Sequence, residues 1–320
     1  MTVSIIITCK NFNKNLEECI SKCKELNYPD FEIIVLPDKN FYFNSSNLKI
    51  VPTGSVLPAK KRDLALKYVK GDILAFLDDD AYPDRDWLLN AVRHFQQPDI
   101  AAVCGPAITP VDDHILQKAG GSVYASWLSS GQNTNRYTPK SLTYVDDFPS
   151  CNFIIRRDIF ERIGGFDTSF WPGEDTILCL KIKQIKKKIL YDPKVLAFHH
   201  RRPLFKEHLK QVSNYALHRG YFVKRFPENS RRFTYFIPSI FVFGLILGAI
   251  LSLFNPFIRN LYMEILLFYL LCVFLFSINK DLRIIPLVFM GIILTHFAYG
   301  INFFRGLLSP RLKEEDEDYN

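Results

Sequence analysis

Residues 71–80 read GDILAFLDDD, and this stretch decides the class of fold. The apolar run over residues 73–77 is typical of a strand buried on both faces of a sheet. It ends in three consecutive carboxylates, Asp78, Asp79 and Asp80. Ligands of open α/β sheets bind beyond the carboxyl ends of the strands, so the triplet lies where a site is expected. The stretch therefore predicts an α/β fold with a functional site at the end of this strand.

Strands and helices alternate on both sides of this stretch. Apolar or β-branched runs predict further strands at residues 3–8, 31–36, 49–51, 100–104, 151–156, 189–191 and 195–199. Apolar residues at helical spacing predict helices at 13–26, 58–69, 84–95, 158–163, 175–186 and 204–226, with caps at Asn13 and Asp84. Strands separated by helices at this spacing form a mostly parallel sheet flanked by helices on both faces.

Residues 233–304 have a different composition, with most of the long apolar runs of the chain and few charges. Residues 233–254 contain no charge and would be about 33 Å long as a helix, enough to cross the hydrocarbon of a bilayer. Two similar segments follow at 257–278 and 284–304. Buried core helices are the alternative, but the chain has too little other protein to surround them. We expect a catalytic domain at 1–230, transmembrane helices within 231–306 and a polar acidic tail at 307–320.

The distribution of basic residues predicts the orientation in the membrane. Nine Lys and Arg residues lie within 201–232, just before the first apolar segment, which marks that side as cytoplasmic. The first residues lack the basic start of a signal peptide, and the seven cysteines resemble buried thiols of a reducing compartment. We therefore expect a multi-pass cell-membrane protein with its catalytic domain in the cytoplasm. If all three segments cross, the tail lies outside.

Charge and motifs exclude several classes of function. The chain has 40 Lys and Arg residues against 33 Asp and Glu residues, and the net charge of +7 is concentrated beside the apolar segments. This placement favours attraction to a membrane surface, and no nucleic-acid partner is expected. Neither a GxGxxG nor a GxxxxGK[ST] motif is present, which disfavours a dinucleotide site and a P-loop kinase.

The carboxylate triplet is a candidate metal site. Like charges a few ångströms apart repel strongly in a partly dry site, and a divalent cation would relieve the repulsion. In extended backbone, Asp78 and Asp80 point the same way, and their hard oxygens suit Mg²⁺ or Mn²⁺. The alternative is a solvated acidic loop. His199 or His200 could complete the metal shell, but alternation along a strand allows only one of them to reach in; surface or packing roles are the alternative.

Two further clusters carry charge at helix starts. Glu174 and Asp175 precede a helix, where Asp175 could be a simple N-cap or a general base facing a substrate. Lys60, Lys61 and Arg62 also begin a helix. They could form a solvated basic face or direct a cation toward the phosphates or base of a nucleotide.

In this order, the motifs over residues 1–200 resemble the family 2 glycosyltransferases with the GT-A fold. The matching blocks are VSIIIT with Asn11, FEIIV with Asp38, KRDLA at 61–65, GDILAFLDDD, IGGFD at 163–167, GEDT at 173–176 and His199. The apolar C-terminal region also looks like the tail of membrane-attached members. Two departures affect the base contacts: Pro37 replaces the first Asp of a common pair, and Cys9-Lys10 replaces the commoner Thr-Tyr.

The resemblance implies a GT-A nucleotide-sugar-binding fold and a role for each matching residue. Asp175 would be the catalytic base, and Trp171 and Glu174 would lie on the acceptor side. The metal, Mn²⁺ or Mg²⁺, would be held by Asp78, Asp80 and His199. The nucleotide-sugar would contact Thr8, Asn11, Asp38, Arg62, Asp78 and Asp79.

The implied function is inverting, metal-dependent transfer from a nucleotide-sugar, such as a UDP-sugar or another NDP-sugar. The acceptor would be a hydroxyl of a membrane-associated glycan, either a lipid-linked saccharide or a polysaccharide. A polyprenyl-phosphate sugar transferase is one alternative, although a phosphate acceptor needs no base such as Asp175. A catalytically inactive scaffold with the same fold is another, against which the presence of Asp78, Asp80 and Asp175 argues.

Overall fold

The computed structural model describes residues 1–43 and 47–317, and these divide into two compact units. The first, here called the sheet unit, comprises residues 1–110 and 135–200. The second, the helical unit, comprises residues 111–134 and 201–316. The helical unit therefore includes an insertion from the first half of the chain and the basic segment that precedes the apolar helices.

The sheet unit contains a mixed eight-stranded sheet in the order β3-β2-β1-β4-β9-β6-β10-β8. Four neighbouring pairs are parallel and three are antiparallel, because β9 and β8 run against their neighbours. A three-stranded sheet, β5-β11-β7, lies beside the site described below. The strands are β1 (Val3–Thr8), β2 (Phe31–Leu36), β3 (Leu48–Ile50), β4 (Ile73–Asp78), β5 (Ala81–Pro83), β6 (Ile100–Cys104), β7 (Ala107–Ile108), β8 (Thr143–Val145), β9 (Asn152–Arg156), β10 (Lys188–Tyr191) and β11 (Ala197–His199).

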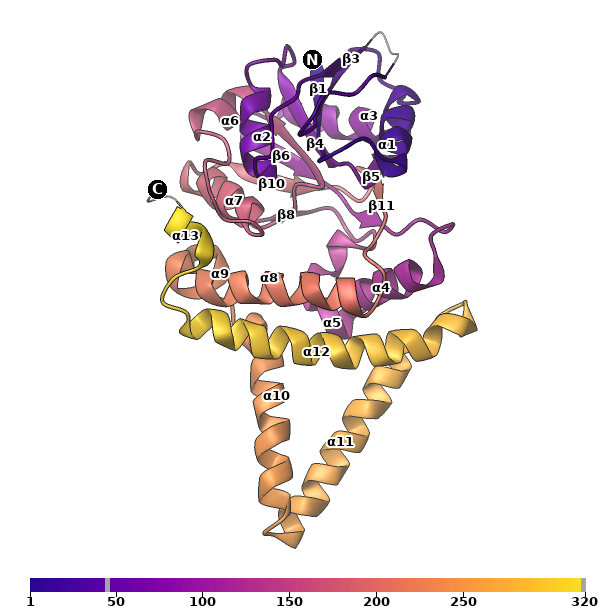
Figure 1. Ribbon diagram of the computed structural model, residues 1–320, viewed down its shortest axis with the longest axis vertical. Helices are drawn as coiled ribbons and strands as arrows, with labels where there is room; N and C mark the ends of the chain where they lie inside the picture. Colours follow the sequence, from indigo (N-terminus) through magenta and orange to yellow (C-terminus); the bar gives the residue numbers. More distant parts are fainter. Residues whose placement is uncertain (44–46, 318–320) are drawn as a thin grey trace. The chain divides into compact units, whose positions relative to one another are not determined.

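Helices cover both faces of the large sheet, which confirms the predicted α/β fold (Figure 1). Alternation along β1 sends Ile5 and Ile7 into one core and Ile6 into the other. The first core is closed by α1 (Lys14–Lys24) and α3 (Trp87–Val92). The second is closed by α2 (Pro58–Ala65), α6 (Arg157–Arg162) and α7 (Glu174–Gln184). Short 3₁₀ helices are η1 (Arg93–Gln96) and η2 (Gly131–Arg136).

The structure confirms one predicted helix boundary and differs from two others. Asn13 caps α1 as expected, because its side chain accepts a hydrogen bond from the Leu16 amide at 2.9 Å. The predicted cap at Asp84 is wrong: α3 has Asp86 at its N-cap, and the Asp84 carboxylate accepts from the Asp86 amide instead. The helix predicted to reach residue 69 ends at Ala65 and continues as turns.

A buried asparagine that sequence patterns did not single out holds the two sheets together. Asn152 is fully buried at the start of β9. Its amide nitrogen donates to the carbonyls of Gly105, Pro106 and Val195 at 2.8–3.0 Å. Its amide oxygen accepts from the Trp87 indole at 2.7 Å. Both polar atoms of this buried side chain therefore have hydrogen-bond partners.

Replacing Asn152 with alanine is expected to destabilise the protein by about 3 kcal/mol, because buried carbonyls and an indole N–H would lose their partner. The loss would appear as a lower thermal unfolding midpoint of the purified protein. Asn40→Ala, at an exposed asparagine, is the matched control and should change the midpoint little. Equal midpoints for the two variants would contradict this role of Asn152.

The helical unit consists of long helices in its second half and a short helical insertion. Its elements are α4 (Ile115–Ala125), α5 (Trp127–Ser130), α8 (Lys206–Arg225), α9 (Pro227–Ser230), α10 (Phe233–Ser252), α11 (Pro256–Ser277), η3 (Leu282–Ile284), α12 (Ile285–Leu308) and α13 (Lys313–Glu317). The helices α10, α11 and α12 occupy the three predicted apolar segments, and each is long and apolar enough to cross a membrane.

Candidate active site

The strand register brings the predicted site residues to one edge of the large sheet. β1 and β4 are parallel neighbours, and Thr8 lies directly opposite Asp78 where both strands end. β2 ends on the other side of β1, with Leu36 opposite Thr8 and Asp38 two residues further on. The carboxyl ends of the three strands therefore place Thr8, Asp38 and the Asp triplet together, as the sequence predicted.

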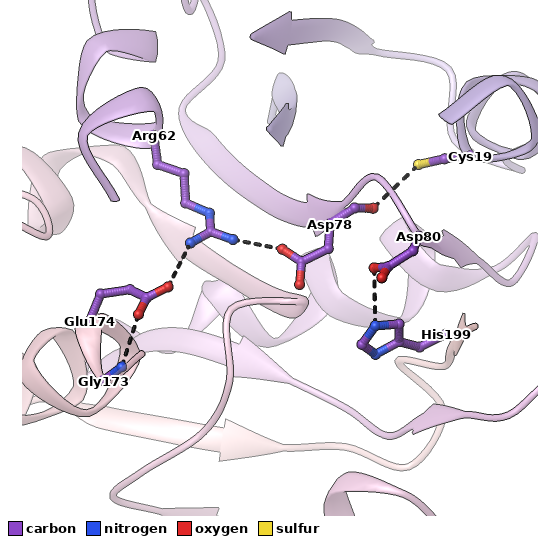
Figure 2. Close-up of polar contacts among 7 residues, drawn as sticks. All are labelled: Cys19, Arg62, Asp78, Asp80, Gly173, Glu174 and His199. Atoms are coloured by element: carbon purple, nitrogen blue, oxygen red, sulfur yellow. Dashed lines mark hydrogen bonds and ion pairs between the residues drawn. The ribbon is translucent and has the colours of Figure 1, made fainter. Parts of the chain in front are cut away.

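The three aspartates of the triplet turn to three different partners. The Asp78 carboxylate accepts from Arg62 at 2.7 Å, and the Asp80 carboxylate lies 3.0 Å from the His199 imidazole (Figure 2). Asp79 points to the start of α1, where the Asn13 amide donates to it at 2.9 Å. Burial raises the pKa of Asp79 to about 6 against the opposing effect of the Asn13 hydrogen bond, and the neighbouring aspartates add to the rise.

Asp78, Asp80 and His199 form a donor set that fits a divalent cation. One ligand atom from each residue lies within 4.8 Å of the others. Two carboxylate oxygens and one imidazole nitrogen suit Mn²⁺, and the carboxylates also suit Mg²⁺. His199 is held in place by β11, where it pairs with Ala81 of β5. His200 faces elsewhere and contacts Glu18 at 2.9 Å, so only one of the two histidines joins the aspartates.

Arg62 links the triplet to a second pair of carboxylates. Its side chain is only 3% exposed, and it contacts Asp78 at 2.7 Å and Glu174 at 3.5 Å (Figure 2). Its guanidinium also lies over the Phe166 ring, 5.4 Å from the ring centroid. The solvated basic face considered for this helix start is therefore wrong for Arg62. It is equally wrong for the buried Lys61, whereas Lys60 is exposed.

Glu174 and Asp175 form the first turn of α7, behind an N-cap at Gly173. The simple N-cap considered for Asp175 is therefore wrong. Burial raises the pKa of Glu174 to about 8; the Asp175 charge adds to this and Arg62 opposes it. Burial also raises the pKa of Asp175, against the Arg62 charge and hydrogen bonds from Ser150. Among the described residues, the buried Oδ1 of Asp175 has no hydrogen-bond partner.

The residues expected around a nucleotide occupy the ends of β1 and β2. Thr8 is buried, and Asp38 forms an ion pair with the Lys61 ammonium. That ammonium also donates to the carbonyls of Cys9 and Leu36 at 2.6 and 3.3 Å, which explains how a lysine is accommodated there.

The remaining predicted site residues are more exposed. The Asn11 side chain is exposed, and its carbonyl accepts from the Asn13 amide at 3.4 Å. Trp171 is 47% exposed in the loop before α7. Both positions leave these side chains accessible to a ligand.

Replacing Arg62 with glutamine is expected to cost about 3 kcal/mol of stability, because the Asp78 carboxylate would lose its buried cationic partner and Asp175 would lose the positive charge that offsets its burial. The figure is at the low end for a broken buried pair, since Asp78 remains 34% exposed and partly solvated. Thermal unfolding of the purified protein measures the loss. Lys60→Gln is the matched control on the same helix. Identical unfolding midpoints for both variants would contradict the contribution of the Arg62 ion pairs to stability.

Comparisons with known proteins identify the family of the chain. The model of glycosyl transferase family 2 matches residues 4–164. A pre-mycofactocin glycosyltransferase of Mycobacterium tuberculosis is 29% identical over 160 residues, which is 50% of this chain and 33% of that longer protein. A dolichyl N-acetyl-alpha-D-glucosaminyl phosphate 3-beta-D-2,3-diacetamido-2,3-dideoxy-beta-D-glucuronosyltransferase of Methanococcus voltae is 23% identical over 275 residues, covering 77% of this chain and 83% of the relative.

Among solved structures, the mannosyltransferase PcManGT from Pyrobaculum calidifontis, in complex with GDP-Man and Mn²⁺, has a similar fold. The TM-score is 0.60 at 18% identity, and the superposition covers 93% of this chain and 86% of the other. The fold is therefore of the GT-A type, followed by three candidate membrane helices. The family match spans the sheet ends that carry the aspartate triplet. The chain belongs to glycosyl transferase family 2.

Proposed function

We propose that this glycosyltransferase moves a sugar, with inversion and with a divalent cation, from a nucleotide-sugar to a hydroxyl of a membrane-associated glycan. One observation carries the proposal: the Arg62 guanidinium contacts both Asp78, which belongs to the candidate metal site, and Glu174. Next to Glu174, Asp175 has a buried Oδ1 that lacks a hydrogen-bond partner among the described residues. Such an arrangement combines a place for a diphosphate with a base for an acceptor.

On the donor side, Asp78, Asp80 and His199 would hold Mn²⁺ or Mg²⁺. When bound, the cation offsets the charge that develops on the leaving nucleoside diphosphate. Thr8, Asn11 and Asp38 would contact the nucleotide at the ends of β1 and β2, and Asp79 would lie beside them. The GDP-Man and Mn²⁺ of the Pyrobaculum structure support a nucleotide-sugar and a divalent cation as partners, without identifying this chain's own donor.

On the acceptor side, Asp175 would remove the proton of the attacking hydroxyl. The oxygen of that hydroxyl forms a bond to the anomeric carbon as the bond from this carbon to the diphosphate breaks. A single displacement of this kind inverts the anomeric centre and needs no covalent enzyme intermediate. Arg62 would orient Glu174, and Trp171 with Glu174 would line the acceptor side. A base of this kind contributes about 10²–10⁴-fold to rate.

The acceptor is proposed to be a lipid-linked or polysaccharide glycan reached from the cytoplasmic face of the cell membrane. The apolar helices and the basic residues of 201–232 support this placement. The relative from Methanococcus voltae, whose name describes a dolichyl phosphate-linked sugar as acceptor, supports a lipid-linked class.

The test is sugar transfer by the full-length protein in nanodiscs, supplied with labelled nucleotide-sugars, Mn²⁺ and a glycolipid extract. We expect label in the lipid fraction, and proton coupling constants of the product should show the anomeric configuration opposite to the donor's. A product that retains the donor configuration would overturn the inverting mechanism. A sugar attached directly to a lipid phosphate would favour the polyprenyl-phosphate alternative.

A further inference from the structure

The helices α8 and α12 lie side by side along most of their length and run in the same direction (Figure 1). His208 of α8 contacts the Thr295 hydroxyl of α12 at 2.9 Å. Further along the pair, a side chain at Gly220 would overlap the Phe303 carbonyl, and a side chain at Gly306 would overlap the Leu217 carbonyl. The two backbones therefore touch, which fixes α12 to α8.

The helix α8 cannot lie in hydrocarbon. Ionisable side chains occur from its first turn to its last: Lys206, Glu207, Lys210, Arg219, Lys224 and Arg225. Each Lys, Arg or Asp at the centre of a bilayer costs about 2.5–3.5 kcal/mol even on the most permissive scale. Since α12 packs along this charged helix, α12 cannot cross the hydrocarbon in this arrangement, although its length and hydropathy alone would allow it.

The helices α10 and α11 form a hairpin whose open end meets α12. Near the hairpin turn, Gly248 of α10 packs against the Tyr262 ring of α11. Away from the turn, Ser239 donates to the Gly300 carbonyl at 2.7 Å, and Tyr269 contacts His296 at 2.9 Å. The legs of the hairpin thus contact α12 through their halves remote from the turn, and α12 lies across them (Figure 1).

The segment after α12 returns to α8. Lys224 donates to the Ser309 carbonyl at 2.7 Å, and Glu314 contacts His218 at 3.1 Å. The Tyr221 hydroxyl donates to Glu315 at 2.5 Å. These contacts require the start of the tail to be on the same side of the membrane as α8.

We propose that α12 lies in the plane of the membrane interface and that only the α10–α11 hairpin crosses the bilayer, so the tail is cytoplasmic with α8. The lipid surface would cover the exposed side of α12, which presents Met290, Ile301, Phe304 and Leu308 at helical spacing. The burial of the three helices supports this proposal. In the most apolar window of each helix, 39% is buried inside the protein for α12, against 17% for α10 and 11% for α11. This topology does not depend on the proposed chemistry.

Cysteines added one at a time test the topology through their reaction with a membrane-impermeant maleimide, in sealed vesicles of both orientations. The reporters are Glu207→Cys on α8, Arg311→Cys between α12 and α13, and Phe254→Cys at the hairpin turn, all at exposed positions, with the unaltered protein as background. We expect Arg311→Cys and Glu207→Cys to react in the same orientation, at least about tenfold faster than in the other. Phe254→Cys should react in the opposite one.

Labelling of Arg311→Cys together with Phe254→Cys would overturn the proposal, because it requires a third crossing. Labelling of Phe254→Cys together with Glu207→Cys would also overturn it, because the hairpin would then not cross. Nitroxides at Ile301 and Leu308 provide a second readout in the full-length protein. An in-plane helix places them at similar depth, whereas a crossing helix separates them by about 10 Å.

Discussion

Asp175→Asn is expected to lower the turnover number for sugar transfer about 10³-fold while leaving donor binding nearly unchanged. Asparagine has almost the shape of aspartate but cannot take a proton from an acceptor hydroxyl. The donor-side residues Asp78, Asp80 and His199 are untouched by this change. Transfer rates and calorimetric titration of the donor measure the two effects separately, and transfer at the unaltered rate would contradict the assignment of the base.

Glu174→Gln is the matched variant on the neighbouring carboxyl group. With its pKa raised to about 8, Glu174 is largely protonated at neutral pH, and glutamine resembles that protonated form. We therefore expect Glu174→Gln to retain transfer within about tenfold of the unaltered rate. A profile in which Glu174→Gln is inactive and Asp175→Asn is active would assign the base to Glu174 instead.

The same pair predicts the direction of the pH dependence. Burial raises the pKa of Asp175, so its carboxylate is lost by protonation at a higher pH than for an ordinary aspartate. Turnover should therefore fall as pH decreases, and the fall should begin at a higher pH than the ordinary pKa of an aspartate would give. The Glu174→Gln variant should keep this acidic limb, because the group that titrates remains. An acid limb that disappears in that variant would contradict the assignment.

Removal of divalent cations is expected to abolish transfer, by about 10³-fold or more, with recovery on addition of Mn²⁺ or Mg²⁺. Without a cation, Asp78 and Asp80 would repel the diphosphate of the donor, and the leaving group would depart without charge compensation. Transfer assays after treatment with EDTA measure this effect. Unchanged activity in EDTA would refute the metal site.

Two variants of the triplet make the metal prediction specific. Asp80→Asn should raise the Mn²⁺ concentration for half-maximal activity at least about tenfold, because it removes a charged ligand beside His199. Asp79→Asn is the control, since the Asp79 carboxylate turns to Asn13. We expect it to keep the Mn²⁺ requirement of the unaltered protein. If both variants raised the Mn²⁺ concentration for half-maximal activity equally, Asp80 would not be a specific ligand of the cation.

The sequence predicted the parts of the site that depend on local pattern. Alternation along a strand sets which of His199 and His200 faces the aspartates, and the ends of β1 and β4 place Thr8 beside Asp78. Contacts between distant segments could not be predicted in this way. Arg62 and Glu174 are 112 residues apart, and their contact depends on how α2 and α7 pack on the same face of the sheet.

The same reason explains why the membrane region was only partly predictable. Hydropathy identifies α12 as an apolar helix but does not reveal the helix against which it packs. Contact with α8 along Gly220 and Gly306 is a tertiary property, and it changes the expected number of crossings. The strand β9 is similar: its apolar residues indicate a strand, but its antiparallel direction depends on the preceding connections. The three-residue strand β8 was not predicted.

The central claim is a cation-dependent nucleotide-sugar site at the ends of β1, β2 and β4. Thermal unfolding of the purified full-length protein, with a panel of nucleotide-sugars in Mn²⁺ or in EDTA, tests it most directly. At a concentration one hundred times its dissociation constant, a bound donor stabilises the folded state by about 2.7 kcal/mol. We predict that at least one nucleotide-sugar raises the unfolding midpoint by several degrees in Mn²⁺ and not in EDTA. If no nucleotide-sugar does so, or if the shift is the same in EDTA, the account is contradicted.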